Sequence, residues 1–332
     1  MANELTVLMA GNMSTEWTDW MRDQLGGGWT VLSWADDEDA EIFLERARQA
    51  DVIVGGRLHH DGISDLANLH VYHIPFTGHD WMGPEALPAG CKLCNTFEHE
   101  IAIAEYAMAG MLEWECGMTR TSDRFKSHRW EGRMPGIGPG RGELFGKTLG
   151  IVGYGHIGRE TAARARAFGM RVDAVSRRAP APDLVQPDNF MGMAGLDAML
   201  GASDYVLVTL PLSDETRGLF DADRFAAMKS DGVIINVGRG RVIDEEAMYR
   251  ALKESRIGGA IIDVWYQYPT KDDPDPTPSK FPYHELDNII MSPHSSARST
   301  NMRTRRWQFV ADNLKRFAAG EAVENVVFEG TG

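Results

Sequence analysis

Short apolar runs alternate with amphipathic segments along two stretches of the chain, and this pattern predicts two α/β domains with parallel sheets. In the first stretch the predicted strands are 6–10, 30–34, 52–54 and 71–75, and the predicted helices are 17–25 and 40–50. In the second stretch the predicted strands are 149–152, 171–175, 205–209, 232–236, 259–263 and 288–291, and the predicted helices are 222–228 and 245–255. Helical spacing of apolar residues also predicts a linking helix at 98–118 and a last helix at 300–317 that returns to the first domain.

The strand at 149–152 runs directly into Gly153, Gly155 and Gly158, and an alanine-rich helical segment follows. Glycines in G-x-G-x-x-G register between a strand and a helix predict a dinucleotide-binding turn. The first glycine permits the tight turn, the second lets the backbone approach a pyrophosphate, and the third lets the helix pack against the strand. The N-terminus of that helix attracts the phosphates. The alternative is an ordinary strand-to-helix turn, which needs no ligand.

The tip of the next strand bears on the choice of cofactor. An NAD site places an Asp or Glu about 20 residues beyond the glycines, where it accepts hydrogen bonds from the ribose hydroxyls. Ser176, Arg177 and Arg178 stand there instead, and two guanidinium groups suit the 2′-phosphate of NADP(H). We therefore expect NADP(H) to be preferred, with NAD(H) as the alternative. In that alternative the arginines are solvated and Asp173, in the middle of the strand, serves the ribose.

Composition narrows the function further. A length of 332 residues suits two domains, and a net charge of −14 argues against a nucleic-acid or anionic-membrane surface. No apolar run approaches the roughly 18 residues that span a bilayer, so we expect no membrane segment and a cytoplasmic location. Cys91 and Cys94 have C-x-x-C spacing, but neither a second pair nor a helix start accompanies them. With Cys116 as the third cysteine, we expect neither a metal site nor a disulfide framework.

Two polar residues that follow predicted strands carry candidate chemistry. Ligands of open α/β folds bind at the carboxyl ends of the strands. Arg239 lies between two glycines, where its guanidinium can meet a substrate carboxylate and align it. His294 follows Pro293, and an imidazole there can give or take a proton near neutral pH. Taken alone, each residue is equally compatible with a structural role.

The runs at 143–158, 210–217, 228–232, 236–240, 242–245, 263–264 and 292–294 form an ordered set of motifs. In order and spacing they resemble the D-2-hydroxyacid dehydrogenase family, of the glyoxylate and hydroxypyruvate reductase type. The resemblance implies two Rossmann-like domains with doubly wound parallel sheets. A cofactor domain at 114–298 would be inserted into a flavodoxin-like substrate domain at 1–113 and 299–332. It also implies a homodimer and, as ligand, a small 2-keto or 2-hydroxy acid.

The resemblance assigns roles to individual residues. Arg239 looks like the arginine that binds the substrate carboxylate, and His294 like the proton donor to the keto oxygen. Thr77 and Gly78 resemble the loop whose backbone N–H groups hold the same carboxylate. The expected cofactor contacts are Gly153, Gly155, His156, Ile157, Gly158, Ser176, Arg177, Arg178, Leu210, Pro211, Thr216, Val237, Gly238, Asp263 and Ser295.

Tyr268 departs from the family pattern. The family usually has a Glu at this place, and a carboxylate beside the catalytic histidine raises its pKa. A phenol lacks that charge, so we expect Tyr268 to orient the imidazole of His294 through its hydroxyl. Formate dehydrogenases of the same superfamily also replace the Glu. An alternative is that Glu285 reaches in from the following loop.

Further departures are expected at the substrate. His79 and His99 add two imidazoles that suit a second polar or acidic group, and Trp130 resembles an interdomain tryptophan that covers the substrate. With Leu58 and Tyr268 these residues would shape the pocket. For all three the alternative is packing or solvent exposure.

The leading interpretation is an NADP(H)-preferring oxidoreductase that interconverts a 2-keto acid and a D-2-hydroxy acid. Tyr268 keeps a formate- or phosphite-type dehydrogenase open as an alternative. A second alternative is a non-catalytic, nucleotide-sensing protein similar to the corepressors built on this fold. Arg239 and His294 argue against it, because a sensor requires neither residue.

Overall fold

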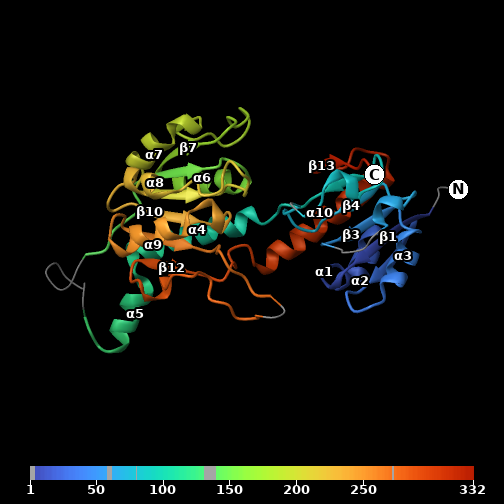
Figure 1. Cartoon of the computed structure of the whole chain (residues 1–332), viewed down its shortest axis with the longest axis horizontal. Helices are drawn as coiled ribbons and strands as arrows, with labels where there is room; N and C mark the ends of the chain where they lie inside the picture. Colours follow the sequence, from blue (N-terminus) through green and yellow to red (C-terminus); the bar gives the residue numbers. More distant parts are fainter. Residues whose placement is uncertain (1–3, 58–61, 80, 131–139, 271–272) are drawn as a thin grey trace. The chain divides into compact units, whose positions relative to one another are not determined.

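A computed structural model describes residues 4–57, 62–79, 81–130, 140–270 and 273–332 of the chain. The chain divides into two compact units, Met1–Glu98 with Thr300–Gly332, and His99–Ser299. Each unit is a sheet of mostly or wholly parallel strands with helices packed on it (Figure 1). The predicted α/β class is therefore confirmed.

The first unit has the strand order β13-β5-β4-β3-β1-β2, in which only β13 runs antiparallel. Its parallel strands follow the order 2-1-3-4-5, as in flavodoxin-like sheets. The strands are β1 (Leu5–Ala10), β2 (Trp29–Trp34), β3 (Val52–Gly55), β4 (Val71–His73), β5 (Lys92–Cys94) and β13 (Val326–Glu329). The helices are α1 (Asn12–Thr15), α2 (Thr18–Leu25), α3 (Ala40–Ala47) and α10 (Thr300–Ala318).

Alternation along β1 distributes its side chains to both faces of this sheet. Leu8 packs in a cluster with Phe43 of α3, whereas Met9 packs in a second cluster with Trp307 and Leu314 of α10. Because both faces are covered, the strands read as continuous apolar runs. The last helix thus completes the core of the first unit, although it lies more than 200 residues beyond β5.

His73 is a fully buried histidine between β4 and α10. The side-chain amide nitrogen of Asn313 lies 3.0 Å from its Nε2, and the ring of Phe309 meets it edge-on. Burial lowers the pKa of His73 from 6.5 to about 4. The folded state therefore holds this imidazole neutral, and the unfolded chain takes up the proton first as the pH falls.

The first prediction concerns acid stability. The pKa of His73 is lower in the folded chain than in the unfolded chain. The stability that the buried, neutral imidazole contributes is therefore complete above pH 6.5 and is lost as the pH falls toward 4. Between pH 7 and pH 5 we expect His73 to remove about 2 kcal/mol from the free energy of unfolding of the first unit. Urea titrations of His73→Gln should show a shallower pH dependence than wild type. The exposed His70 provides the control, and an equal slope in His73→Gln would contradict the assignment.

The second unit has the strand order β12-β11-β10-β9-β6-β7-β8, and every pair is parallel. This is the Rossmann order, with its switch point between β6 and β9. The strands are β6 (Thr148–Val152), β7 (Arg171–Val175), β8 (Asn189–Met191), β9 (Tyr205–Val208), β10 (Val233–Asn236), β11 (Gly259–Ile262) and β12 (Ile289–Met291). The helices are α4 (Glu100–Cys116), α5 (Met118–Lys126), α6 (His156–Ala167), α7 (Leu196–Ala202), α8 (Ala222–Ala227) and α9 (Glu245–Lys253).

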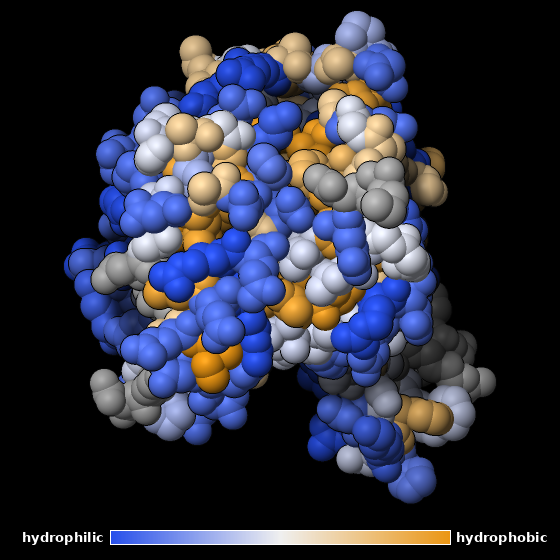
Figure 2. Space-filling view, turned by 90° about the vertical axis from the view of Figure 1, so that its right-hand side faces the viewer, coloured by the Kyte–Doolittle hydropathy of each residue, from blue (hydrophilic) through white to orange (hydrophobic). Residues whose placement is uncertain are grey.

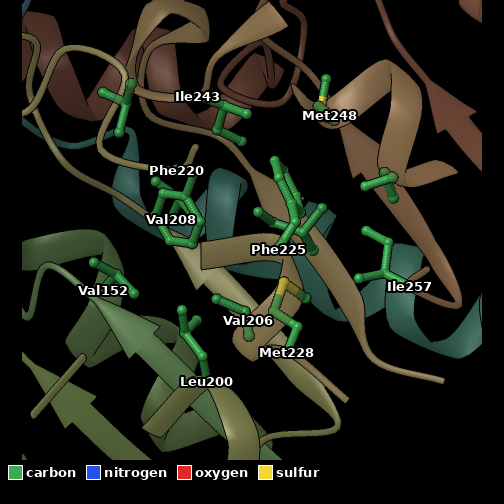
Figure 3. Packing of buried hydrophobic residues seen from close by; sticks show 14 of the residues in the cluster. Val152, Leu200, Val206, Val208, Phe220, Phe225, Met228, Ile243, Met248 and Ile257 are labelled. Carbon is green, nitrogen blue, oxygen red and sulfur yellow. The ribbon is translucent and has the colours of Figure 1, made fainter. Parts of the chain in front are cut away.

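Helices cover both faces of this second sheet. On one face Val152, Val206 and Val208 pack with side chains of α7, α8 and α9, which point toward one another in Figure 3. On the other face Leu149 and Ile151 pack with α4 and α6. The sheet is therefore doubly wound, as predicted.

The second unit begins earlier in the chain than the predicted cofactor domain, which was expected to begin at residue 114. The observed boundary lies at Glu98, so that the whole of α4 belongs to the second unit. Met108 and Met111 of this helix pack against β6 in the second core. Gly110 lies so close to Ile261 of β11 that a Cβ there would stand 2.9 Å from its Cγ2.

The elements that were not predicted include the helices α1, α5 and α7 and the strands β8 and β13. Helix α5 is exposed along its whole length and projects from the second unit (Figure 1). It therefore has no buried face, and a buried apolar face is what a sequence pattern detects. Strands β8 and β13 are short edge strands with half-exposed side chains. Edge strands carry weak apolar patterns, and a sequence pattern does not identify them.

The three cysteines carry free thiols. Cys91 and Cys94 are buried in the first unit, where burial raises the pKa of each thiol to about 12. Cys116 is partly exposed at the end of α4, and Nη1 of Arg141 donates to its sulfur at 3.2 Å.

Hydrophilic residues dominate the face of the molecule in Figure 2, and the hydrophobic residues on it form small separate groups. Among the helices of the described residues, none is long and apolar enough to cross a membrane.

Candidate active site

The glycine turn after β6 has the geometry that its sequence predicts for a dinucleotide. Gly153 has φ +98°, a left-handed conformation that favours glycine. A Cβ at Gly158 would lie 2.6 Å from the carbonyl oxygen of Gly153, so α6 can approach β6 only with glycine there. A Cβ at Gly155 would meet no atom within 4 Å. The open space beside Gly155, at the start of α6, is where a phosphate group has room to approach the backbone.

A pocket of about 500 Å³ opens at this turn, at the switch point of the sheet. It brings together seven of the residues predicted to contact the cofactor, namely Gly153, Gly155, Ser176, Arg177, Leu210, Pro211 and Thr216. Apolar side chains of Met193, Leu196 and Leu219 line it as well. An apolar wall, an open glycine turn and a guanidinium together fit an adenine nucleotide.

The other predicted cofactor residues lie around this pocket or beyond it. His156, Ile157 and Gly158 form the first turn of α6, and Arg178 is exposed beside Arg177. Gly238 lies against the loop after β9, where a Cβ would stand 2.8 Å from the carbonyl oxygen of Leu210. Val237 is buried in the core.

Asp173 takes no part in the pocket. Its carboxylate is buried in β7 and accepts a hydrogen bond from Nε of Arg171 at 2.9 Å. Arg177 and Glu215, in contrast, both line the pocket, where Nη1 of Arg177 lies 3.1 Å from a carboxylate oxygen of Glu215.

A second group of predicted residues follows three neighbouring strands. Arg239 follows β10, Asp263 follows β11 and His294 follows β12. Because these strands pair in parallel, their carboxyl ends meet at one edge of the sheet.

Asp263 holds the loop that carries His294. The carboxylate is fully buried, and it accepts hydrogen bonds from the N–H groups of Ser295 at 2.8 Å and Ser296 at 3.0 Å. It also accepts from the hydroxyl of Ser292, whose oxygen lies 2.6 Å from the Tyr106 hydroxyl. His294 has φ +54°, an uncommon backbone conformation for a residue other than glycine. The Asp263 carboxylate thus stabilises the loop that carries His294, and the contact with the cofactor that the resemblance implies for it stays a prediction.

Tyr268 contacts His294 through its ring. The two ring centroids lie 5.5 Å apart with an interplanar angle of 56°. The Tyr268 hydroxyl accepts the backbone N–H of Trp265 at 3.0 Å, and the indole N–H of Trp265 donates to the carbonyl of Ser292 at 2.8 Å. The expectation that the hydroxyl orients the imidazole is therefore replaced by a ring contact, with the hydroxyl anchored to the backbone.

Burial and two neighbouring charges shift the pKa of His294. Desolvation lowers the pKa of the imidazole below its ordinary value of 6.5, and the positive charge of Arg239 lowers it further, whereas Asp263 acts in the opposite direction. Desolvation raises the pKa of Tyr268, so the phenol stays neutral. His294 is therefore mainly neutral at pH 7.

Arg239 is an exposed guanidinium on a fixed loop. The side chain of Asn236 accepts from the N–H of Gly238 and donates to the carbonyl of Arg239, each at 3.1 Å. Nη1 donates to the carbonyl of Gly238 at 2.9 Å. No carboxylate of the described residues forms an ion pair with this guanidinium, so most of its donors are available to an anionic ligand.

The predicted substrate residues belong to different units. Thr77, Gly78 and His79 follow β4 in the first unit, where Asn95 donates to the carbonyl of Thr77 at 2.9 Å. His99 directly precedes α4 in the second unit.

Trp130 also belongs to the second unit. It lies beyond α5, 61% exposed, with its ring 4.9 Å from that of Phe125. Leu58 lies outside the described residues. The backbone N–H of Glu285 donates to the carbonyl of Pro282 at 3.1 Å, and its carboxylate forms no hydrogen bond or ion pair with a described residue.

Tyr106, Asn236, Ser292 and Glu215 were not predicted as site residues. Glu215, Asn236 and Ser292 fall inside the quoted motifs, so a closer reading of those motifs would have found them. Tyr106 gave no local signal, because its partner Ser292 lies 186 residues away.

Comparisons with known proteins identify the family of the chain. A family model described as "D-isomer specific 2-hydroxyacid dehydrogenase, NAD binding domain" matches residues 108–296. D-3-phosphoglycerate dehydrogenase from Methanocaldococcus jannaschii is 32% identical over 86% of this chain, which spans about half (53%) of that relative. Glyoxylate reductase from Thermococcus onnurineus is 30% identical over 90% of this chain and 89% of its own length.

Solved structures also resemble almost the whole chain. One of them is the NADPH-dependent glyoxylate/hydroxypyruvate reductase from Sinorhizobium meliloti in complex with NADP and sulfate, with a TM-score of 0.74 and 25% identity. The similarity covers 97% of this chain and 98% of that one. From its family match and its relatives, this chain belongs to the D-isomer specific 2-hydroxyacid dehydrogenases, a family of NAD(P)-dependent enzymes.

Proposed function

We propose that the protein is an NADP(H)-preferring reductase that interconverts a small 2-keto acid and the corresponding D-2-hydroxy acid. The observation that carries the proposal is the placement of Arg239, Asp263 and His294 at the ends of three adjacent strands, in the same unit as the nucleotide pocket. Relatives named glyoxylate reductase and hydroxypyruvate reductase support glyoxylate and hydroxypyruvate as the first substrates to test.

The pocket residues suggest how the cofactor would be held. The open turn at Gly155 and the N-terminus of α6 would take the pyrophosphate, and Ser176, Arg177 and Arg178 would take the 2′-phosphate. The structural relative bound to NADP supports this preference. When bound, the cofactor supplies the hydride that the reaction transfers.

The chain's own residues would bind and polarise the substrate. The guanidinium of Arg239 holds the carboxylate and fixes the carbonyl beside His294. In reduction the imidazolium of His294 donates its proton to the carbonyl oxygen, and in oxidation the neutral imidazole accepts the hydroxyl proton. Asp263 keeps the loop of His294 in place in both directions.

The lowered pKa of His294 makes the balance between these directions depend on pH. Because the pKa of His294 lies below 6.5, the protonated form needed for reduction declines above that pKa, whereas the neutral form needed for oxidation prevails there. We expect reduction to be faster on the acidic side and oxidation on the neutral side.

Restoring a carboxylate beside the imidazole should shift this balance. Tyr268→Glu places a negative charge near His294, which raises its pKa, so the pH at which the reduction rate falls should move upward by about one unit. The pH profile of kcat/KM for glyoxylate measures the shift. Tyr268→Gln is the matched control, because it has the shape of Glu without its charge. An equal shift in both variants would show that charge is not the cause.

One set of assays tests the proposed function. NADPH and NADH oxidation are followed in parallel with glyoxylate, hydroxypyruvate, pyruvate and a bulky aryl keto acid. Turnover with NADPH well above NADH is expected, and NADH preference would contradict the role of Arg177 and Arg178. If no keto acid is reduced although cofactor binds, assays with formate and phosphite would test the alternative that Tyr268 suggests.

We also propose a homodimer. Helix α5 and the residues after it expose Met118, Phe125 and Trp130, at 65%, 50% and 61% of their surfaces. An exposed group of large apolar side chains on a projecting helix suits burial against a second copy. Sedimentation velocity of the wild-type chain distinguishes one copy from two.

A further inference from the structure

We propose that Glu215 sets how strongly the protein prefers NADP(H) over NAD(H), because its carboxylate competes with the 2′-phosphate for Arg177. This inference rests on the proposed function, in which the pocket beside Gly153 holds the cofactor. It adds a residue that opposes the preference created by the two arginines.

Glu215 is presented to the pocket by a fixed turn after β9. The hydroxyl of Thr216 accepts the N–H of Ser213 at 2.8 Å and donates to the carbonyl of Pro211 at 2.7 Å. These bonds tie the two ends of the turn together, and Glu215 stands between them on the pocket wall. Its Oε2 accepts a hydrogen bond at 3.1 Å from Nη1 of Arg177, which follows β7 and lines the same pocket.

The pair of Arg177 and Glu215 is weak enough to open. Their side chains are 73% and 71% exposed, and ion pairs that are solvated to this extent contribute little to stability. A 2′-phosphate can therefore take Arg177 from Glu215. The phosphate can bind Arg177 only when this pair breaks, so part of the attraction between Arg177 and the phosphate is offset by the lost attraction between Arg177 and Glu215.

Arg177 is the cation of this pocket that Glu215 neutralises. Arg224 lines the pocket, but its Nε lies 3.1 Å from the carboxylate of Asp197. Arg178 is exposed and forms no ion pair within the described part of the chain, so it remains available to a phosphate. NAD(H), which lacks the phosphate, leaves the pair of Arg177 and Glu215 intact. Glu215 thus penalises NADP(H) selectively.

Cofactor titrations of the full chain test the inference. The dissociation constants of NADPH and NADH are measured by fluorescence for wild type and Glu215→Gln at low ionic strength. We expect Glu215→Gln to bind NADPH about three- to ten-fold more tightly and NADH within about two-fold of wild type, and the gain to shrink as salt is added. Asp214→Asn is the matched control, because it removes a neighbouring exposed carboxylate that does not line the pocket.

A double variant locates the effect. If Glu215 competes with the 2′-phosphate for Arg177, Glu215→Gln should tighten NADPH binding much less in a chain that also carries Arg177→Ala. Equal tightening of NADPH and NADH, the same gain in Asp214→Asn, or an unchanged gain without Arg177 would each overturn the inference. A wild-type chain that binds neither cofactor would overturn the proposed function, and this inference with it.

Discussion

Replacing His294 by Asn should lower kcat for keto-acid reduction by about 10²- to 10⁴-fold, the usual contribution of a positioned general acid. Asn suits this position because it tolerates the left-handed backbone that His294 adopts at φ +54°. The hydrogen bonds from Ser295 and Ser296 to Asp263 come from the backbone, so they should survive the substitution. The loss should therefore reflect the missing proton donor.

The pH profile separates this role from a structural one. In wild type the reduction rate should fall as the pH rises through the pKa of His294, and in His294→Asn the residual rate should lose that dependence. NADPH affinity should stay unchanged, because His294 lies outside the nucleotide pocket. His284→Asn, at another exposed histidine of the same unit, is the control. A variant that retains the wild-type profile would exclude His294 as the acid.

Replacing Arg239 by Ala should lower kcat/KM for glyoxylate by about 10²- to 10³-fold, because two charge-assisted hydrogen bonds to the substrate carboxylate are lost. Arg239→Lys should recover only part of the loss, since Lys keeps the charge but not the planar fork. Steady-state kinetics with the three proteins measure both effects. Because Arg239 also lowers the pKa of His294, the comparison is made at a pH where each variant is fully active.

A substrate without a carboxylate makes this test specific. Glycolaldehyde offers a carbonyl group but no anion, so its slow turnover should change little in Arg239→Ala. The neighbouring Arg241→Ala, at an exposed arginine two residues away, controls for the loss of a positive charge. Equal losses on glyoxylate and glycolaldehyde would mean that Arg239 maintains the loop and does not bind the carboxylate.

Local patterns were sufficient to predict most of the two sheets. A parallel strand buried on both faces is a continuous apolar run, as β6 and β10 are, and the glycines after β6 mark the turn by their spacing alone. Strand β13 was missed because it pairs with β5, more than 200 residues earlier in the chain. No local pattern reports such a pairing.

The chemistry of the site was less accessible to sequence than its location. Arg239 and His294 could be placed at strand ends. The loop of His294, however, is held by hydrogen bonds to Asp263 from residues that lie 29 to 33 positions later in the chain. The ring contact of Tyr268 depends on where its hydroxyl is anchored, which only the folded backbone defines. Roles created by long-range contacts of this kind follow from the tertiary structure.

The differing environments of the three thiols have a practical consequence. Thiol-directed reagents attack the thiolate, so Cys91 and Cys94, buried and with pKa values near 12, should remain unmodified in the folded chain at neutral pH. The thiol of Cys116 is partly exposed, and Cys116 is the last residue of α4, two positions before the projecting α5. The wild-type chain therefore offers a natural single position for a spin label, and the separation of two such labels would report directly on how two copies are arranged.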